Sequence, residues 1–324
     1  MERRASLSGV SLLRTAGSRV FSQREGLGNQ QSLCGREPPV ILSVVIITYN
    51  EEVNIRRTLA SVQPLVMEGR GEVIVVDSGS TDRTVEIAKS SGAKVFVEEW
   101  KGYAAQKNSA IDKASGDWIL SLDADEEVAS DLSAEIRDRE AICARNPADG
   151  DREMCLTMEH ASVGSRHLDK IGGAPIGYWI SRKNYFLGRW IRHGGFWPDP
   201  KLRLFRRGAG RFENRAVHED VQLHGPTKRL RSSLIHHSYP TLDEYIDHMN
   251  RYSSLGAEMV VASGERGFSL FNILLRPFGT FLYNYFFRLG FLDGREGLLL
   301  HLYHAVYVSW KYAKVWEFSR RERA

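Results

Sequence analysis

The chain has 324 residues, of which 42% are hydrophobic and 26% are charged, and its formal net charge is +4. This composition excludes a disordered chain, and the net charge is too small to indicate nucleic-acid binding, so no nucleic-acid partner is expected. The three cysteines, Cys34, Cys143 and Cys155, have no paired spacing, which argues against a disulfide framework or a zinc knuckle and makes a reducing, cytosolic setting the default.

No segment of the sequence is long and apolar enough to predict a membrane-spanning helix. Such a helix needs about 18 apolar residues, and the longest candidates, residues 277–287 and 297–310, are shorter and contain polar side chains. The first 38 residues contain six arginines and no apolar core of the kind that signal peptides have. We therefore expect a disordered leader over residues 1–38, with a targeting segment as the alternative.

Short apolar runs rich in valine and isoleucine alternate with helical patterns from residue 40 to residue 125. Strands are expected at residues 40–49, 72–77, 93–99 and 117–125, with helices in the intervals between them. Alternation with short loops predicts an α/β fold in which a mostly parallel sheet is flanked by helices on both faces. In such sheets, ligands bind beyond the carboxyl ends of the strands.

Polar residues gather directly after three of these strands, at residues 48–52, 77–82 and 123–127. Some of these acids can simply cap the following helix. A carboxylate at the end of a buried strand is costly, however, unless a ligand or a cation compensates it. We therefore expect functional roles for three of the acids: Asp77, Asp123 and Asp125.

Asp123 and Asp125 are separated by one residue at the end of the fourth strand. In an extended strand, residues i and i+2 point the same way, so both carboxylates are expected to face one ligand. Two carboxylates so close repel each other unless a cation lies nearby. Mg²⁺ or Mn²⁺ binds carboxylate oxygens and completes its shell with water and phosphate oxygens. The position of this pair at a strand end therefore predicts a metal-bound diphosphate.

Beyond a polar break at residues 146–153, the sequence pattern changes. A strand is possible at residues 153–161, and a loop or helix is expected over residues 184–191. From residue 241 onward the pattern is helical and crowded with Phe, Tyr, Trp and Leu. Two further strands are expected, at residues 201–207 and 234–239.

Three stretches resemble the nucleotide half of the inverting family 2 glycosyltransferases, which have the Rossmann-like GT-A fold. They are SVVIITYNEEVNIRRTLASV (43–62), EVIVVDSGSTDRTVEIAKSSGAKV (72–95) and the run from Gln106 to Asp125. The resemblance covers about residues 41–128. It implies that Asp77 accepts a hydrogen bond from uracil or ribose and that Asp123 and Asp125 form the metal and diphosphate motif. Thr48 stands where many members carry proline. The implied nucleotide-sugar-binding residues are Thr48, Asn50, Glu51, Asp77, Lys107, Asn108, Asp123 and Ala124.

The second half of the chain is similar to the bacterial lipopolysaccharide-core glucosyltransferases of that family. The similarity rests on residues 182–207, 211–219 and 287–317 and extends the resemblance to nearly all of residues 40–318. It implies transfer of glucose from UDP-glucose to a lipopolysaccharide-core or related glycolipid, in the cytoplasm on the inner face of the bacterial inner membrane. We expect a catalytic domain over residues 39–240, with a nucleotide-sugar half (39–128) and an acceptor half (150–240), and a helical region over 241–324.

An inverting transfer needs a carboxylate that takes the proton of the attacking hydroxyl group. The candidates are Glu219, Asp220 and Asp199, and the resemblance places Glu219 in this role. We interpret His218 as an orienting or packing side chain rather than a base. His236 is either a third metal ligand or a hydrogen-bonded core histidine.

The acceptor side of the site is expected near residues 197–207. Lys201 and Arg203 alternate with leucines, so they share one strand face, which is either simply solvated or suited to a phosphorylated acceptor. Asp199 lies beside them. Four aromatic residues offer a floor on which a sugar could stack, or are part of the core: Trp179, Trp190, Phe196 and Trp197.

The C-terminal region, from residue 241 onward, has aromatic-rich apolar stretches followed by Lys and Arg. This pattern favours peripheral membrane contact through the C-terminal region.

Two other enzyme classes are excluded by the sequence. A Rossmann dehydrogenase or a P-loop enzyme would need a glycine-rich motif that the sequence lacks. A polyprenyl-phosphate or other cell-envelope glycan transferase, and a non-catalytic nucleotide-sugar-binding protein, stay as alternatives.

Overall fold

A computed structural model describes residues 42–144, 174–213, 220–264 and 269–321, all of which belong to the unit Pro38–Ala324. The expected leader, the possible strand at residues 153–161 and the residues His218 and Glu219 lie outside the described residues. The domain bounds given above stay a prediction.

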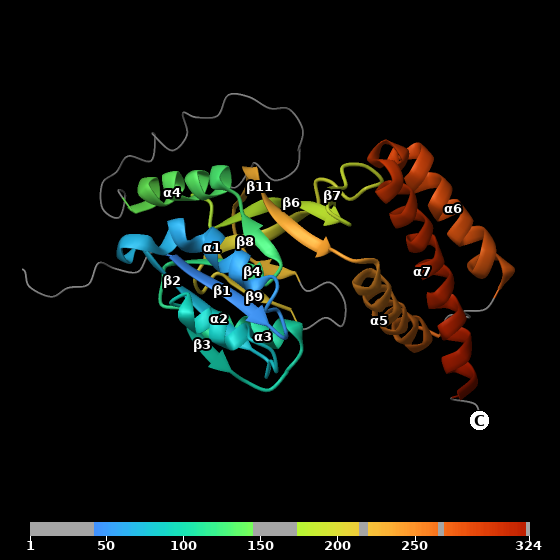
Figure 1. Cartoon of the computed structure of the whole chain (residues 1–324), viewed down its shortest axis with the longest axis horizontal. Coiled ribbons are helices and arrows are strands. Elements are labelled where there is room, and N and C mark those ends of the chain that lie inside the picture. The colour runs from blue at the N-terminus through green and yellow to red at the C-terminus, as the bar shows by residue number, and fades with distance from the viewer. Residues whose placement is uncertain (1–41, 145–173, 214–219, 265–268, 322–324) are drawn as a thin grey trace, which may run out of the picture. The chain divides into compact units, whose positions relative to one another are not determined.

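The core of the fold is a nine-stranded sheet whose first half is parallel (Figure 1). Its order is β3-β2-β1-β4, and each of these strands pairs in parallel with its neighbour. The four strands expected from the sequence are therefore confirmed, and their carboxyl ends share one edge. Their bounds are β1 (Leu42–Thr48), β2 (Gly71–Asp77), β3 (Lys94–Val97) and β4 (Trp118–Asp123).

The second half of the sheet continues from β4 in the order β8-β6-β11-β5. β8 pairs antiparallel with β4 and with β6, whereas β11 is parallel to β6 and antiparallel to β5. β7 pairs with β6, and β9 and β10 form a separate two-stranded sheet. The bounds are β5 (Glu126–Val128), β6 (Gly177–Phe186), β7 (Arg189–Trp190), β8 (Pro200–Arg206), β9 (Gly210–Phe212), β10 (Val221–Leu223) and β11 (Thr227–Tyr239).

The expected loop or helix over residues 184–191 is wrong, because this stretch is a hairpin between β6 and β7. Leu187 and Gly188 form its two-residue turn, and both have positive φ values, 49° and 80°. Two-residue hairpin turns of this kind usually carry Asn-Gly or Asp-Gly. Leucine in the first position removes the usual sequence signal.

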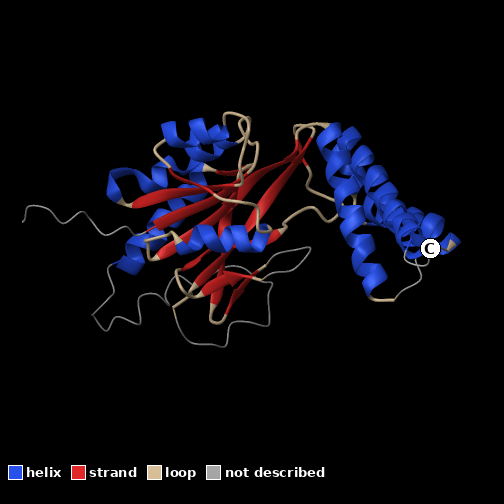
Figure 2. Ribbon diagram, turned by 90° about the horizontal axis from the view of Figure 1, so that it is seen from below, coloured by secondary structure: helices blue, strands red, loops and turns tan. Residues whose placement is uncertain are grey.

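Helices cover both faces of the sheet (Figure 2). Val44 and Ile46 of β1 belong to the core cluster that includes side chains of α1, α2 and α4, whereas Val45 belongs to a cluster that includes α3. Alternate residues of one strand therefore serve opposite faces, as a strand buried on both sides requires. The bounds are α1 (Ile55–Val66), α2 (Thr84–Ser90), α3 (Tyr103–Asp112) and α4 (Ser130–Ala144), and a 3-10 turn, η1 (Met67–Gly69), follows α1.

The C-terminal region is helical, as expected. α5 begins after Thr241, whose hydroxyl oxygen accepts a hydrogen bond from the Glu244 N–H and so caps the helix. Within the described residues, no helix combines the length and the apolar character that crossing a bilayer requires. The bounds are α5 (Leu242–Ala262), η2 (Phe271–Leu275), α6 (Arg276–Leu282), η3 (Tyr283–Phe287), η4 (Gly290–Asp293) and α7 (Gly294–Arg321).

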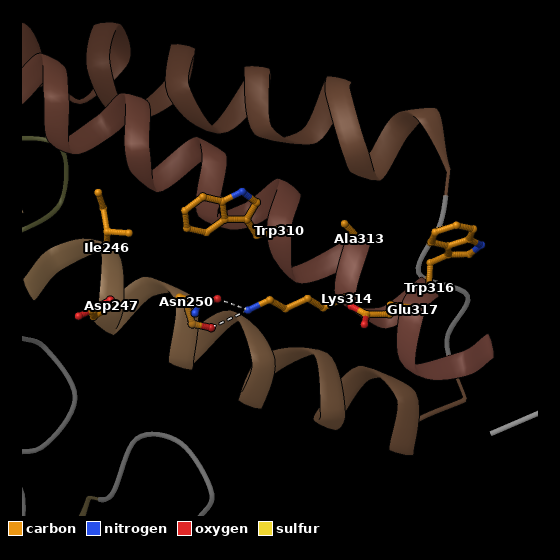
Figure 3. A pocket seen from close by; sticks show the side chains of 8 residues that line it. All are labelled: Ile246, Asp247, Asn250, Trp310, Ala313, Lys314, Trp316 and Glu317. Atoms are coloured by element: carbon orange, nitrogen blue, oxygen red, sulfur yellow. Dashed lines mark hydrogen bonds between the residues drawn. The ribbon is translucent and has the colours of Figure 1, made fainter. Parts of the chain in front are cut away.

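Helices α5 and α7 pack side by side, and a lysine links them. Lys314 Nζ donates to the main-chain and side-chain oxygens of Asn250 at 2.7 and 2.6 Å (Figure 3). A cleft of about 440 Å³ lies beside this contact, and Trp310 and Trp316 are among its lining residues. The cleft contains none of the acids at the sheet edge, so the chemistry expected from the sequence lies elsewhere.

A buried aspartate joins the helical region to the loop that follows β7. Asp293 accepts hydrogen bonds from the N–H groups of Arg192 (3.2 Å) and His193 (2.8 Å) and contacts His193 Nδ1 at 2.9 Å. Next to it, a Cβ atom on Gly194 would lie 1.9 Å from the ring of His301, so only glycine fits there. We call these contacts of Asp293 and His301 with residues 192–194 the Asp293 clasp.

The amino ends of the parallel strands bury one carboxylate, that of Glu72. It accepts hydrogen bonds from Ser43 Oγ (2.7 Å), from the N–H and Oγ of Ser115 (2.7 and 2.8 Å) and from Lys94 Nζ (2.7 Å). Burial alone raises the pKa of this carboxyl, but the four hydrogen bonds outweigh it and lower the pKa to about 2.

Candidate active site at the carboxyl edge of the sheet

Asp77 ties together the loops that follow β1 and β2. Its side chain is fully buried. Oδ2 accepts from Thr48 Oγ1 (2.9 Å) and Ser80 Oγ (2.5 Å), and Oδ1 accepts from the N–H groups of Gly79 (2.9 Å) and Ser80 (2.8 Å). A carboxylate has about four acceptor positions, and all are used here. In this state Asp77 shapes the loop, and its contact with uracil or ribose stays a prediction.

Asn50 and Glu51 line the same edge. Asn50 has a φ of 55°, and its Oδ1 accepts from the Thr81 N–H at 2.8 Å, so it joins the β1 loop to the β2 loop. Glu51 accepts one side-chain hydrogen bond, from Asn54 at 2.9 Å. Burial outweighs that bond, and together with the nearby charge of Asp125 it raises the Glu51 pKa to about 7. A carboxyl that titrates near neutrality in a predicted ligand pocket is a common feature of functional sites.

Asp123 lies between two cations. Its Oδ1 is 2.8 Å from Lys107 Nζ and its Oδ2 is 2.5 Å from Arg203 Nη2. Burial raises the pKa of this carboxyl, but Arg203 and Lys107 outweigh it and hold the pKa well below its usual range. Asp123 is therefore a compensated anion before any metal binds.

The expectation that Asp123 and Asp125 share one strand face is wrong. β4 ends at Asp123, and Asp125 lies in the turn that leads into β5. The alternation of side chains in an extended strand therefore does not apply to them. Asp123 pairs with Lys107 and Arg203, whereas Asp125 pairs with His236. Among the described residues, no group of three or more His, Cys, Asp or Glu side chains is arranged to hold a metal ion.

Asp125 faces a histidine of β11. His236 Nε2 lies 3.3 Å from Asp125 Oδ2, and its Nδ1 lies 2.7 Å from Asn184 Oδ1. Asn184 Nδ2 donates to the Phe196 carbonyl (3.1 Å) and to Asp199 (3.0 Å), which fixes the orientation of the amide. The Asn184 oxygen therefore accepts a hydrogen bond from Nδ1–H, which Ser238 Oγ also approaches at 2.8 Å, and Nε2 faces the carboxylate.

This arrangement favours a cation between Asp125 and His236. If Nε2 carries no proton, its lone pair points at a carboxylate, and the two repel unless a proton or a metal ion lies between them. A metal-binding histidine usually donates its other ring N–H to an oxygen, as His236 does to Asn184. Burial raises the pKa of Asp125, yet His236 outweighs it and lowers the pKa. One carboxylate and one imidazole thus fit a divalent cation whose other ligands come from water and phosphate.

A buried chain of charges runs from Asp123 into the second half of the sheet. Arg203 Nη2 is 2.6 Å from Glu126 Oε1, Arg182 Nη1 is 3.1 Å from the same atom, and Arg182 Nη2 is 2.7 Å from Asp199. Arg203 is 4% exposed, which rules out one of the two alternatives stated above, a simply solvated strand face. Its contact with an acceptor, and that of the half-buried Lys201, stay predictions.

Asp199 is held as an anion. Burial raises the pKa of its carboxyl, but Arg182 and Asn184 outweigh it and lower the pKa. Its backbone has a φ of 39°, in the left-handed region. A carboxylate that is paired in this way binds a proton weakly, which argues against Asp199 as the base.

The remaining predicted residues are Asn108, Ala124, Asp220 and Trp197. Both ends of the Asn108 amide hold the main chain of Phe212, at 2.9 and 3.0 Å, so this residue fixes α3 to β9. Ala124 is buried, and its carbonyl accepts from Thr58 Oγ1. Asp220 is exposed. Trp197 stands edge-to-face against Trp190, with ring centroids 5.3 Å apart.

Sequence reasoning missed three residues of this site, Glu126, Arg182 and Asn184. Glu126 was visible as a member of the acidic run, but nothing in the run marks it as the fully buried partner of two arginines. Arg182 and Asn184 lie in or beside the hairpin that was not recognised, and their partners are distant in sequence.

Comparisons with known proteins support one family. The model of "Glycosyl transferase family 2" matches residues 43–143. An uncharacterized glycosyltransferase of Rickettsia typhi is 32% identical over 87% of this chain and 89% of its own length. The lipopolysaccharide core biosynthesis glycosyltransferase LpsC of Rhizobium meliloti is 30% identical over 86% of this chain and 93% of its own length.

Several solved structures match part of the chain, among them a glucosyl-3-phosphoglycerate synthase from Mycobacterium tuberculosis in complex with Mn²⁺, UDP-glucose and phosphoglyceric acid. The match has 34% identity over 26% of this chain and 34% of that chain, with a TM-score of 0.25.

Proposed function

Because the chain belongs to family 2 of the glycosyltransferases, we propose that it transfers glucose from UDP-glucose to a lipopolysaccharide-core or related glycolipid, with inversion at the anomeric carbon. The chain is a glycosyltransferase, and its mostly parallel sheet flanked by helices has the GT-A fold. The acceptor class is supported by the Rhizobium meliloti relative, which matches this chain over most of its length.

The observation that carries the proposal is the Asp125–His236 pair at the carboxyl edge of the parallel strands. We propose that these two side chains hold a divalent cation, Mg²⁺ or Mn²⁺, which when bound neutralises charge on the departing diphosphate. Asn184 orients His236 for this role, at 2.7 Å. Lys107 and Arg203 keep Asp123 ionised beside the diphosphate, as its lowered pKa indicates.

The nucleotide is proposed to lie over the loops that follow β1 and β2. Thr48, Asn50 and Asp77 are joined by hydrogen bonds through Ser80 and Thr81, so the two loops form one rigid wall. A wall that is ordered before the ligand arrives lowers the entropic cost of binding.

The base is proposed to be Glu219, with Asp220 as the second candidate. Asp199 is less suited because Arg182 and Asn184 already bind its carboxylate. Glu219 follows β9 in sequence, and β9 is fixed to α3 through Asn108.

The test is UDP release from a panel of UDP-sugars, with Mg²⁺ or Mn²⁺, in the presence and absence of extracted lipid A–core. Release that requires the metal, one sugar and the acceptor is the expected result. Glu219→Gln should abolish transfer and leave UDP-sugar binding intact, whereas Asp220→Asn should retain most of the activity. Nucleotide binding without release for any sugar would contradict the proposal and favour a binding protein. Release with a polyprenyl phosphate instead of lipid A–core would assign another envelope acceptor.

A lipid-linked acceptor also bears on where the enzyme works. We propose that it acts in the cytoplasm on the inner face of the bacterial inner membrane, with peripheral contact through residues 241–324. The aromatic and basic residues of that region support this proposal.

A further inference from the structure

The segment from Ser269 to Asp293 exposes an unusual number of large apolar side chains. Eleven of them are each at least 43% exposed, whereas only six reach this exposure among the described residues before this segment, 42–264 with their gaps. Single exposed apolar residues are normal, but a contiguous set marks an interaction site. We call this set the apolar face. It consists of Leu270, Phe271, Leu274, Leu275, Phe278, Tyr283, Phe286, Phe287, Leu289, Phe291 and Leu292.

The apolar face has helical spacing. Phe271, Leu274, Leu275 and Phe278 follow the i, i+3, i+4, i+7 pattern over η2 and α6, so they lie along one side of the helix. Phe278 is 61% exposed. Such a stripe normally points into the core of a protein, and here it points to solvent.

The other side of the same segment is already packed against α7. Ser309 Oγ donates to the Ile273 carbonyl at 3.0 Å, Arg276 donates to the hydroxyl group of Tyr312, and Pro277 is buried. The segment is thus fixed in place, and folding back onto α7 is not open to the apolar face.

The charge of the segment indicates what covers the face. From Ser269 to Leu292 the sequence contains two arginines, Arg276 and Arg288, and no Asp or Glu. Helix α7 ends in two exposed arginines, of which Arg321 pairs with Glu317 at 2.6 Å and Arg320 lies over the ring of Trp316. Aromatic and leucine side chains accompanied by cations, without acids, suit the interface of a membrane that contains anionic lipid.

We propose that the apolar face inserts into the interfacial layer of an anionic phospholipid bilayer and holds the enzyme on the membrane. The inference rests on the proposed function, because a lipid-linked acceptor is what makes attachment at a membrane useful to this enzyme. It goes further by assigning attachment to one segment, η2 to η4, and by naming the lipid chemistry.

The experiment is co-sedimentation of the full chain with vesicles that contain neither donor nor acceptor. Wild-type protein is expected to sediment with phosphatidylethanolamine–phosphatidylglycerol vesicles and less with phosphatidylcholine vesicles. Phe278→Glu and Leu274→Glu should each weaken binding to the anionic vesicles about tenfold, because a carboxylate then faces hydrocarbon and anionic headgroups. Met67→Glu is the matched control: Met67 is 57% exposed, lies outside the apolar face and acquires the same charge, so this variant should bind like wild type.

Three results would overturn the inference. The first is wild-type protein that stays in the supernatant with both kinds of vesicle, and the second is full binding by Phe278→Glu. The third is a wild-type dimer that Phe278→Glu converts to a monomer without any vesicle binding, which assigns the face to a second copy of the chain. Circular dichroism of each variant separates these results from misfolding. Because the vesicles carry no substrate, a negative result leaves the transferase proposal untouched, and that proposal is tested by UDP release alone.

Discussion

The two ends of the parallel sheet each carry a glutamate whose pKa is strongly shifted, and the shifts are opposite. At the amino end, four hydrogen bonds bind Glu72 and lower its pKa to about 2. At the carboxyl end, Glu51 accepts one side-chain hydrogen bond, and burial raises its pKa to about 7. Burial disfavours the anion in both places. The number of fixed donors decides the outcome.

The difference shows how one sheet separates stability from chemistry. Glu72 joins β1, β2, β3 and the turn before β4 through partners that leave it no capacity for a ligand. At the opposite edge, Glu51 and Asp125 have few fixed partners, and this edge is where ligands bind in open α/β sheets. Two other acids of this edge, Asp77 and Asp123, are fully paired, so the incomplete compensation concerns Glu51 and Asp125.

The largest expected effect is at the carboxyl end, from Asp125→Asn. Loss of the charge that faces His236 should lower kcat by about a thousandfold or more, since an electrostatic group at the reacting centre is removed. UDP release measures this, with unfolding in urea as the check on stability. Asp138→Asn, an exposed acid on α4, is the control and should be fully active. Full metal-dependent turnover by Asp125→Asn would show that the pair is not the site.

A smaller loss is expected from Asn184→Ala, because Asn184 contacts the Asp125–His236 pair through His236 and also donates a hydrogen bond to Asp199. Without the amide oxygen, the Nδ1–H of His236 loses its hydrogen-bond acceptor and the imidazole ring is no longer held in one orientation. The apparent affinity for Mn²⁺ should therefore fall by about 10- to 100-fold. The measurement is the Mn²⁺ concentration that gives half-maximal activity, with kcat at saturating metal nearly preserved. A loss of kcat with unchanged metal dependence would instead place Asn184 in a purely structural role.

At the amino end, Glu72→Gln should affect stability and leave catalysis alone. The variant should lose about 2 kcal/mol of unfolding free energy at pH 7, because buried hydrogen bonds to a charged acceptor are weakened. The pKa of Glu72 is lowered in the folded state, so its contribution is complete above about pH 4.5 and disappears as the pH falls toward 2. Urea unfolding at pH 7, 4 and 3 should therefore show wild type and variant converging. Exposed Glu86→Gln is the control, and a constant difference at every pH would contradict the assignment.

The smallest effect is expected from Glu51→Gln, which should raise the unfolding free energy, whereas Glu72→Gln lowers it. The pKa of Glu51 is raised on folding, so the folded protein loses stability as the pH rises from about 4.5 to 7. The variant lacks this penalty and should be about 1 kcal/mol more stable than wild type at pH 8 and equal to it at pH 4. Equal stability at both pH values would show that Glu51 has an ordinary pKa.

The sequence predicted the parallel half of the fold well, because its strands are buried on both faces. Runs such as residues 44–47 and 73–76 are apolar throughout, and the acids that follow them stand out. The strands of the acceptor half were harder to predict from the sequence. The turn at Leu187 and Gly188 carries no usual signal, and β6 contains charged residues, Arg182 and Lys183, that mask a strand.

The candidate site was predicted in its location and only in part in its geometry. Asp125 was expected beside Asp123 on an extended strand, and one turn at Ala124 redirected it to His236. The pairing of Arg203 with Glu126, and of Arg182 with Asp199, joins residues 77 and 17 positions apart. The charges in the sequence alone do not predict which of several acids will form the ion pair with a given arginine.

The Asp293 clasp makes the helical region and the loop after β7 a matched pair. A chimera that exchanges only the tail with a related enzyme replaces Asp293 and His301 but keeps Gly194 and the N–H groups of Arg192 and His193. A bulkier side chain in the place of His301 would collide with Gly194, and any side chain other than a carboxylate in the place of Asp293 would leave the two N–H groups without their acceptor. An active chimera therefore has to take residues 192–195 and the C-terminal helices from the same parent enzyme.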